Sequence, residues 1–394
     1  MMFMKYIVLL FCLCLLESCS SNKRQNNVNT TNGSFVLNSD TKPRIIKVKL
    51  DDKDFYNRVD DCLRMVSYVK LAPVPLLAPI VKILVSDGRI YIQDRLSQLV
   101  CYDMDGHVVF HIKAVGSGPG EYAEISSFAL DELRGELVLY DDLKTSLLYY
   151  SMDKGRFLRK VNFQKPNPSE IVFHDSVFFY NNRNHKSYPN DSLLHYSLLS
   201  SKDGLIIDKY CFPHDSAEEE YIFSPSLQTF NINDDKLYYC KNFDTTIYEV
   251  SSDSVRSCYK LDLPNLLPNS VIKDRTDERT IVKSNYSFGI SHVYESGRLL
   301  YFRFYNGGYI WNCFYDLYCD KQICCVKALQ EKPTPNVPLI DIVDGVYEGM
   351  FYSLLTPEFI DYYVSQSPQD YPTDFQLYDA ESDNPIVMFY NIIE

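Results

Sequence analysis

Short runs of β-branched and aromatic residues alternate with polar turns along most of the chain, and few stretches follow a helical period. The clearest example is residues 82–112, where the runs ILV, RIYIQD, QLVCYD and VVFHI are separated by the turns DG, RLS and MDG. Apolar runs bounded by Asp and Gly turns are typical of β-strands. Residues 82–112 are therefore predicted to form a four-stranded antiparallel meander.

The same pattern recurs at a spacing of roughly 50 residues. In residues 126–163, Asp141 and Gly155 take the places that Asp94 and Gly106 have in the first unit. Weaker copies follow at 171–212, 227–263 and 288–329, and an irregular one begins near residue 340. Four-stranded repeats with this spacing are typical of propeller blades. The sequence therefore predicts an all-β fold, a six-bladed β-propeller with four-stranded antiparallel blades.

The segment LRMVSYVKL, residues 63–71, precedes the first unit and has no partner within it. Unpaired strand edges invite association with other chains. We therefore expect this segment to pair beside DNPIVMFYNII at the C-terminus, so that an N-terminal strand in the last blade closes the ring. Residues 44–394 are predicted to form this single propeller domain.

The N-terminus carries an apolar run from Tyr6 to Leu16, followed by Glu17, Ser18 and Cys19. The run is too short to span a bilayer, which needs about 20 residues. It resembles a bacterial lipoprotein signal, residues 1–18, which implies cleavage before Cys19 and lipidation of that cysteine. An ordinary secreted signal peptide or a short membrane anchor is the alternative.

Residues 19–43 are rich in Asn, Ser and Thr and poor in apolar residues, so they are predicted to form a flexible tether. No acidic cluster directly follows Cys19. By analogy with lipoprotein sorting signals, this favours attachment to the outer membrane, facing the periplasm. Display on the cell surface is the alternative.

The glycine-rich stretch GSGPGEY lies between the last strand of the first unit and the first strand of the second. A phosphate-binding loop would lead into a helix N-terminus, and a P-loop would add Lys-Ser or Lys-Thr. The sequence has neither feature here, so we interpret the stretch as a structural inter-blade loop. Its residues are Gly116, Gly118, Pro119, Gly120, Glu121 and Tyr122.

Several of these motifs resemble a known family. VGSGPGEYAEISSF, the preceding YDMDGHVVFHI, the earlier KLAPVPLLAPIVKI and the terminal DNPIVMFY are similar to segments of the six-bladed β-propeller lipoproteins of Bacteroides and relatives. The resemblance extends from about residue 45 over most of the chain. It implies a propeller fold and a lipid anchor, and it implies no established reaction.

Composition narrows the range of partners. The 394 residues carry a formal net charge of -13, which argues against nucleic acid because binding phosphates requires a basic surface. Most of the 32 Tyr and 23 Phe lie within predicted strands and are expected to fill the space between blades.

The twelve cysteines do not form an evident disulfide framework. Cys12 and Cys14 belong to the signal and Cys19 is the lipidation site, so nine remain, and an odd number leaves at least one unpaired. Residues such as Cys101 and Cys240 lie in predicted strands, where a free cysteine packs as a small hydrophobe. Free core cysteines are therefore expected. One or two disulfides, or a metal site, are the alternatives.

The sequence predicts no catalytic residues, no metal ligands and no cofactor. The seven histidines form no HExxH or HxH pair, and no GxSxG motif is present. We therefore expect a binding or interaction scaffold for a protein or glycan, with loops such as 184–191 and 365–375 as its recognition surface.

Two other classes of function remain open. One is a hydrolase or lyase with a metal or acid/base site at the mouth of the propeller channel. Such an enzyme should bring three or four Asp, Glu, Asn or His side chains together there, whereas a binding module should not. The other is a passive structural lipoprotein.

Overall fold

Within the residues that this computed structural model describes, the apolar runs form strands that assemble into five sheets. The described residues are 33–38, 42–51, 62–162, 168–183, 195–214, 228–274, 276–327, 343–365, 368, 371–379 and 381–393. All of them belong to the unit Gly33–Glu394.

Three sheets have four antiparallel strands, each paired with the next strand along the chain. The first sheet contains β5 (Ile80–Ser86), β6 (Arg89–Asp94), β7 (Leu99–Asp103) and β8 (Val108–Ile112). The second contains β9 (Ser127–Asp131), β10 (Glu136–Asp141), β11 (Ser146–Ser151) and β12 (Phe157–Asn162). The third contains β21 (Phe288–Ser296), β22 (Leu299–Asn306), β23 (Tyr309–Asp316) and β24 (Lys321–Lys327).

The two remaining sheets are larger because segments from the N-terminus join them. One contains β13 (Pro168–His174), β14 (Val177–Asn182), β15 (Tyr196–Ser201) and β16 (Lys209–Pro213), with β1 (Gly33–Ser34) parallel to β16. The ten-stranded sheet contains β17 (Phe230–Asn233), β18 (Lys236–Cys240), β19 (Thr246–Val250), β20 (Ser254–Asp262), β25 (Gly345–Tyr347), β26 (Met350–Leu355), β27 (Ile386–Ile392), β4 (Leu63–Lys70), β2 (Val36–Asn38) and β3 (Arg44–Lys47).

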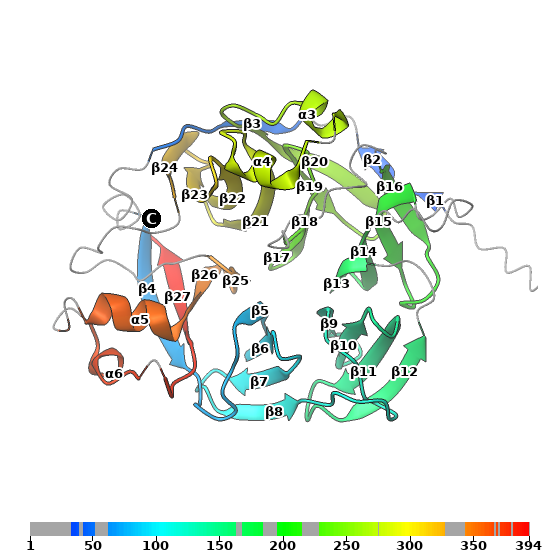
Figure 1. The fold of residues 1–394 in the computed structure, drawn as a ribbon, viewed down its shortest axis with the longest axis vertical. Helices are drawn as coiled ribbons and strands as arrows, with labels where there is room; N and C mark the ends of the chain where they lie inside the picture. Colours follow the sequence, from blue (N-terminus) through cyan, green and yellow to red (C-terminus); the bar gives the residue numbers. More distant parts are fainter. Residues whose placement is uncertain are drawn as a thin grey trace, which may run out of the picture. The chain divides into compact units, whose positions relative to one another are not determined.

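These sheets have the arrangement of an all-β propeller with four-stranded antiparallel blades, which confirms the predicted fold class at this level. Figure 1 shows the sheets around a common centre, with β5, β9, β13, β17, β21 and β25 as the innermost strands. Burial follows this order, since β10 is buried along almost its whole length and the outer strand β12 is largely exposed. Inner and middle strands have neighbouring sheets against both faces, so they tolerate few polar positions.

The segment that precedes the first sheet pairs with the last strand of the chain. β4 runs antiparallel to β27, with Val69 opposite Val387 and Leu63 opposite Ile392. The sequence predicts this pairing for residues 63–71. Both strands would otherwise expose an unpaired edge.

The prediction of a flexible tether that extends to residue 43 is wrong for its last part. β1 and β2 lie within that stretch and pair in parallel with the outer strands β16 and β20. The cause is local, because Phe35 between them is only 3% exposed and packs in the apolar cluster around Phe179 and Phe230. Burial of this ring, together with the backbone pairing of β1 and β2, offsets the entropy lost when the polar residues around it are ordered.

The recurrent Asp at the end of the second strand has the same role in the first two sheets. The Asp94 carboxylate accepts a hydrogen bond from the amide of Ala78 at 2.9 Å, and the Asp141 carboxylate accepts one from the amide of Ala123 at 2.6 Å. Each also accepts an amide of its own turn. Ionised carboxylates accept several such bonds at once. The repeat in the sequence therefore reflects a shared way of fixing the chain as it enters each blade.

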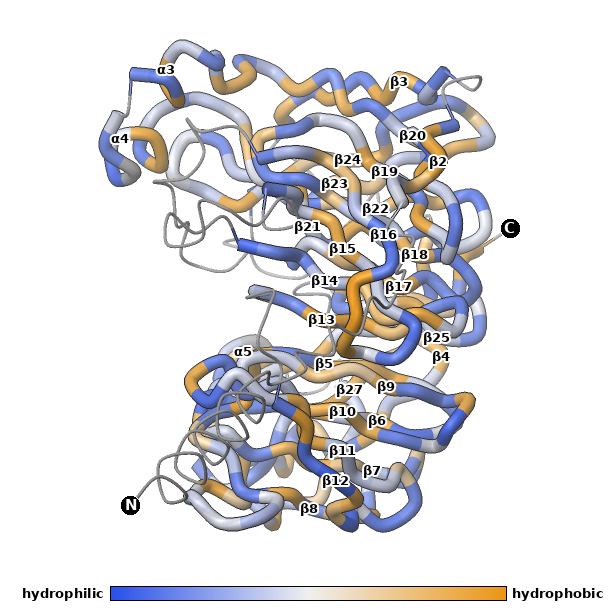
Figure 2. The backbone as a smooth tube through the Cα atoms, turned by 90° about the vertical axis from the view of Figure 1, so that its right-hand side faces the viewer, coloured by the Kyte–Doolittle hydropathy of each residue, from blue (hydrophilic) through white to orange (hydrophobic). Residues whose placement is uncertain are grey.

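Aromatic rings fill much of the space between neighbouring sheets, as the composition leads us to expect. Tyr91, Tyr122, Phe128 and Tyr150 pack in one cluster between the first and second sheets. Figure 2 shows apolar positions recurring along the strands.

The connections contain short helices that the sequence analysis does not predict. They are α3 (Asn269–Lys273), α4 (Glu278–Lys283), α5 (Pro357–Val364) and α6 (Thr373–Gln376). Helices of one or two turns leave too weak a periodic signal to be recognised. In the described part of the chain, none of the helices has the length and apolar character needed to cross a bilayer.

One pair of cysteines departs from the expectation of free thiols. Cys313 on β23 and Cys325 on β24 form a disulfide, and they lie directly opposite each other in the strand register. Cys101, Cys211 and Cys240 are buried thiols within strands, as expected. The spacing of Cys313 and Cys325 in the sequence does not reveal their pairing, because it depends on the register of two strands.

Candidate functional site in the central cavity

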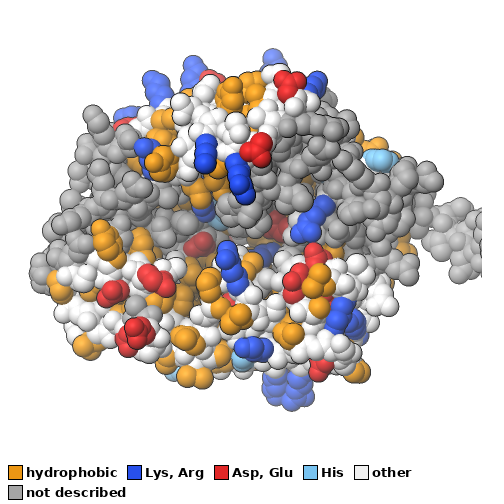
Figure 3. Space-filling view, viewed as in Figure 1, with side chains coloured by type: hydrophobic (Ala, Val, Ile, Leu, Met, Phe, Trp, Pro, Cys, Tyr) orange, Lys and Arg blue, Asp and Glu red, His pale blue; other side chains and the backbone are white. Residues whose placement is uncertain are grey.

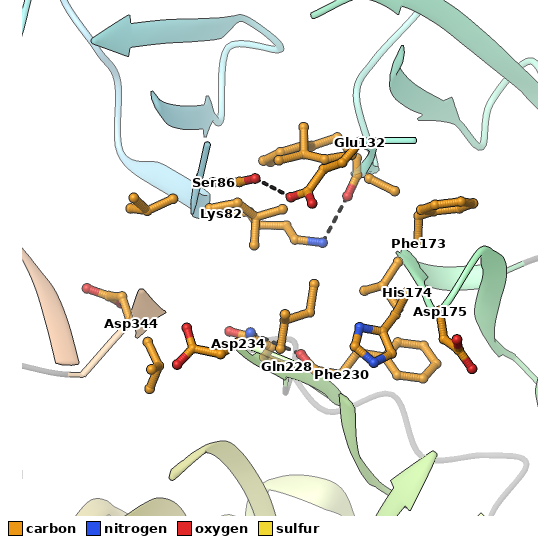
Figure 4. Close-up of a pocket in the computed structure, with 18 of the residues that line it drawn as sticks. Lys82, Ser86, Glu132, Phe173, His174, Asp175, Gln228, Phe230, Asp234 and Asp344 are labelled. Atoms are coloured by element: carbon orange, nitrogen blue, oxygen red, sulfur yellow. Dashed lines mark hydrogen bonds between the residues drawn. The ribbon is translucent and has the colours of Figure 1, made fainter. Parts of the chain in front are cut away.

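A cavity of about 280 Å³ opens where the inner strands end. Its lining comes mainly from the C-terminal ends of β5, β9, β13 and β17 and from β25, so several distant stretches of sequence meet there (Figure 4). A concave site at the converging ends of strands is a common place for ligand binding. We therefore treat this cavity as the candidate functional site.

Lys82 extends from β5 into the cavity and connects three sheets. Its Nζ donates to the backbone oxygens of Phe128 on β9, at 3.0 Å, and Ile171 on β13, at 3.3 Å. It also lies 3.9 Å from Oε1 of Glu170. Burial lowers the pKa of Lys82, and the charge of Glu170 partly opposes that effect. The ammonium group is thus held mainly by backbone carbonyls.

Glu170 extends the same network to the next sheet. Its Oε2 accepts hydrogen bonds from the amide and hydroxyl of Thr229, at 2.9 and 2.7 Å, and from the amide of Phe230, at 3.2 Å. Nearby, Nε2 of Gln228 donates to the hydroxyl of Tyr294 at 3.0 Å. Lys82 and Glu170 therefore connect the inner strands around the cavity to one another. Their charged groups already make hydrogen bonds within the protein, which indicates a role in positioning these strands.

The acidic side chains at the mouth do not converge on one point. Ser86 donates to the carboxylate of Glu132, while Asp175 accepts from the amide of Ser252 at 2.9 Å and Asp234 from the amide of Gly349 at 3.0 Å. Figure 4 shows Asp175 directed away from the middle of the cavity. Figure 3 shows both acidic and basic side chains around the middle of this face.

His174 lies at the end of β13, on the cavity wall. Burial lowers the pKa of its imidazole, and the neighbouring Asp175 partly opposes that effect. The side chain is therefore neutral near pH 7, and because one ring nitrogen is hydrogen-bonded to the backbone of Asp235, it can offer the other nitrogen to a ligand. Hydrogen bonding of a polar molecule is the chemistry that this arrangement suits.

Apolar groups form the rest of the lining. The rings of Phe128, Phe173 and Phe230 border the cavity, and Leu133 stands exposed at its mouth. Rings next to hydrogen-bonding groups are the combination that binds molecules with one apolar and one polar face.

A metal centre is not built into this cavity by the described side chains. In the described residues, Asp103, Asp105 and His107 are the group of potential ligands close enough to share an ion. They lie on the turn between β7 and β8, where Oδ1 of Asp103 accepts the amides of the other two residues at 3.0 and 2.8 Å. That contact is the ordinary way in which a turn aspartate satisfies its backbone.

The predicted inter-blade loop lies between β8 and β9, away from the cavity lining. The hydroxyl of Tyr122 accepts from the amide of Ala114 at 3.0 Å and donates to the oxygen of Ser97 at 2.8 Å. The carboxylate of Glu121 accepts from the amide of Gly118 at 2.6 Å.

Gly120 has a φ of +76°, and the ring of Phe157 leaves no room there for a Cβ. Gly116 is held through its oxygen by Lys144, and Pro119 lies at the tip of the loop.

Other predicted positions fall outside the described residues. These are the lipidation site Cys19, the signal peptide 1–18 and the loop 184–191. The loop 365–375 is described only in part.

Sequence reasoning missed the residues that line the cavity. Lys82 belongs to a different repeat from Glu170 and His174, and the arrangement of the sheets around a common centre brings them together. One signal is visible in retrospect, since Lys82 interrupts the apolar run IVKILV on a strand that is buried on its other side. A cation within such a run is rare unless it has partners.

Comparison with known proteins places the chain in a family and supports its fold. The family described as "Domain of unknown function (DUF4934)" matches residues 45–391. No curated protein sequence matches the chain significantly.

Two solved structures are similar in fold. A protein of Bacteroides fragilis described as "Putative exported protein" is 17% identical with a TM-score of 0.72, covering 90% of this chain and 100% of its own. A member of the DUF4221 family from Bacteroides vulgatus is 12% identical with a TM-score of 0.50, covering 85% of this chain and 99% of its own. At these identities the likeness concerns the fold alone.

Proposed function

The chain belongs to the family described as "Domain of unknown function (DUF4934)", and from this premise we propose that it is an exported, membrane-anchored propeller that binds a ligand. The ligand is a protein or a glycan, as the sequence analysis anticipates. The cavity favours a glycan, because a concave site of about 280 Å³ lined by rings and hydrogen-bonding groups suits a sugar better than a protein surface.

Six blades are part of this proposal. β17 and β25 are joined by one parallel pair, Asn233 with Val346, whereas the strands within each blade are antiparallel. The ten-stranded sheet therefore counts as two blades that touch at their inner strands. In the second of them β4 supplies the fourth strand beside β27, so an N-terminal strand closes the ring.

Anchoring through Cys19 is the second part. The apolar run before Cys19 and the polar stretch after it support a lipoprotein, and the similar Bacteroides fragilis protein is described as exported. The location that follows is the outer membrane, with the propeller facing the periplasm. Metabolic labelling with a radioactive fatty acid tests this, because label should enter the native chain and be absent from Cys19→Ser.

The main support for binding without catalysis is that acidic groups at the cavity mouth accept hydrogen bonds from the protein itself. Asp175 and Asp234 accept backbone amides, and Glu132 accepts the hydroxyl of Ser86. Carboxylates that accept such bonds position the walls of a pocket, and this is the role that we propose for these three. Phe173 and His174 can instead contact a sugar ring from its apolar and polar sides.

The experiment is an array of bacterial envelope glycans probed with the mature chain, followed by calorimetry on the glycan retained. We expect Phe173→Ala and His174→Ala to weaken binding roughly tenfold or more, the effect of losing a stacking or hydrogen-bonding partner. Glu136→Gln is the matched control and should bind normally, because Glu136 pairs with Arg159 and does not line the cavity. Retention of no glycan, or equal binding by all variants, would contradict the proposal.

A hydrolase or lyase acting at the channel mouth is the second candidate. One observation favours it, since Lys82 lies in the cavity wall 3.9 Å from Glu170 and burial lowers the pKa of its amino group, as is common for groups at catalytic sites. Mass spectrometry of the retained glycan after prolonged incubation distinguishes the two functions. Cleavage of the glycan by the native chain would support the enzyme, and an unchanged glycan supports the binding protein.

A further inference from the structure

A second cavity, of about 490 Å³, lies at the other end of the inner strands. It is bordered by residues 76–83 at the start of β5, by the segment that leads into α5 and by residues near the start of β27. The first cavity is bordered by the opposite end of β5. Lys82, Gln228 and Asp344 line both cavities, so they lie between the two.

The wall of the second cavity is distorted at His292 on β21. Two register shifts flank Ser291, so that β21 carries extra residues relative to β22 on both sides of that position. His292 has a φ of +51°, a left-handed conformation that few residues other than glycine adopt. Bulges of this kind redirect side chains and are common beside functional sites.

Arg303 on β22 is a buried cation without an anion. It lines the second cavity, it is 8% exposed, and its Nε has no hydrogen-bond partner. None of the described carboxylates forms an ion pair with it. A guanidinium stays charged at any pH at which a protein folds, so burial without a counter-charge is unfavourable.

Other arginines of the described chain show what is usual for this protein. Six of them form ion pairs with carboxylates: Arg44, Arg134, Arg159, Arg183, Arg256 and Arg298. All six side chains are at least one third exposed, so they need a partner less than Arg303 does. Arg64, Arg89, Arg95, Arg156 and Arg279 also have no carboxylate partner among the described residues, but none of them is buried, so Arg303 is the one buried arginine of the described chain.

His292 adds, next to Arg303, a second buried polar group that lacks a hydrogen-bond partner. Its Nδ1 is buried without a hydrogen-bond partner. Burial, reinforced by the charge of Arg303, lowers the pKa of the imidazole well below its usual value, so the ring is neutral. A neutral imidazole can donate one hydrogen bond from the nitrogen that carries the proton.

The opening of the cavity has the opposite charge. Glu358 and Glu381 line it and are exposed, and Asp383 also lines it but is paired with Lys70. The cavity wall thus carries two cations, Arg303 and Lys82, and one carboxylate, Asp344, and the exposed Glu358 and Glu381 add negative charge at its rim. A ligand with an anion at one end and a cation at the other matches both.

We propose that the second cavity binds a small amino-acid-like ligand, with its carboxylate on Arg303 beside His292 and its ammonium group toward Glu358 and Glu381. Guanidinium and carboxylate form two parallel hydrogen bonds, which accounts for an arginine at this position. The site differs from the glycan site proposed above, so either can fail without the other.

The test is calorimetry on the mature chain with three peptides: trialanine, its C-terminal amide and its N-acetyl derivative. Trialanine should bind saturably. The amide, which lacks the carboxylate, should bind at least tenfold more weakly, since a charge-assisted hydrogen bond is lost. The N-acetyl derivative keeps the carboxylate and should lose only a few-fold, because rim charges are exposed to solvent.

Two variants separate recognition from folding. Arg303→Met should bind trialanine at least tenfold more weakly than the native chain, while its thermal midpoint without ligand stays equal or rises, because an unpaired buried charge has been removed. Arg298→Met is the matched control, since Arg298 is paired with Asp316 and does not line the cavity, and it should bind normally.

Three results would overturn the proposal. One is the absence of saturable trialanine binding to the native chain. Another is equal binding of trialanine and its amide, which needs no variant and so remains decisive if Arg303→Met fails to fold. The third is tighter binding of inorganic phosphate than of trialanine, which would make the site one for a compact anion.

Discussion

Lys82 on β5 lies 3.9 Å from Glu170 on β13, although the whole sheet β9–β12 separates these strands along the chain. The two side chains are 12% and 13% exposed, so the pair lies largely out of solvent. Together with the bond from Lys82 to Phe128, this contact links the inner strands of three sheets.

Replacing Lys82 by Met should therefore destabilise the fold. Glu170 would keep its contacts to Thr229 and Phe230 but lose its nearby cation, and removing one member of a buried pair costs about 3–5 kcal/mol. The free energy of unfolding in urea measures the effect. Lys70→Met serves as the control, because the Lys70 side chain is 36% exposed and its pair with Asp383 should contribute less than about 1 kcal/mol. Equal losses in the two variants would contradict this account.

Gly120 gives a second prediction. Gly120→Ala should cost about 2–4 kcal/mol, because the new Cβ would lie 2.7 Å from the ring of Phe157 and the backbone is left-handed. Gly88→Ala separates these causes, since its φ is +64° but nothing lies within 4 Å of the added Cβ. It should cost about 1–2 kcal/mol. Thermal unfolding of both variants provides the comparison, and an equal loss would show that Phe157 moves aside.

Substitution of Phe35 tests whether β1 and β2 stabilise the outer strands β16 and β20. Phe35→Ala should lower the free energy of unfolding by about 3–5 kcal/mol, the usual loss for a buried phenyl ring. The adjacent Val36 is 61% exposed, so Val36→Ala should change it by less than about 0.5 kcal/mol. If residues 33–38 behave as a free tether, neither substitution will change the free energy of unfolding.

His292 predicts a loss of stability in acid. The pKa of its imidazole is well below 6.5 in the folded chain, mainly because of burial, with a further contribution from Arg303. As the pH falls through 6.5, the unfolded chain takes up a proton that the folded chain does not, so unfolding becomes easier by up to about 1.4 kcal/mol per pH unit. Above pH 6.5 the group has no effect.

His292→Asn should remove that part of the pH dependence. Asn tolerates the left-handed backbone, so the bulge can persist. Urea unfolding between pH 5.5 and 7 should show a shallower slope for the variant than for the native chain. The lowered pKa of His174 acts in the same direction and is present in both, so only the difference between them is attributed to His292. Identical slopes would mean that His292 titrates normally in the folded chain.

The repeated strands were readable from the sequence because their signal is local. The turns DG and MDG flank β6 and β8, and Asp94 and Asp141 recur because each fixes the backbone at the same place in its blade. The pairing of β4 with β27 also followed from a simple argument about unpaired edges.

Features that depend on how distant sheets and strands come together could not be predicted from the sequence. The parallel pairing of β2 with β20 joins distant segments, and the sequence around Phe35 is otherwise polar. The cavity residues occupy unrelated repeats. Likewise, nothing near His292 marks a bulge, because its extra residues are defined only against the register of β22.

The pairing of β4 with β27 has a consequence for how the chain is made. Lys70 and Asp383 meet across 313 positions, so a chain synthesised or exported from its N-terminus cannot complete this sheet until nearly all of it has emerged. A product that stops short of β27 would leave β4 with an open edge and its apolar face uncovered. Proteases can then distinguish shortened chains from finished ones by this single unpaired edge.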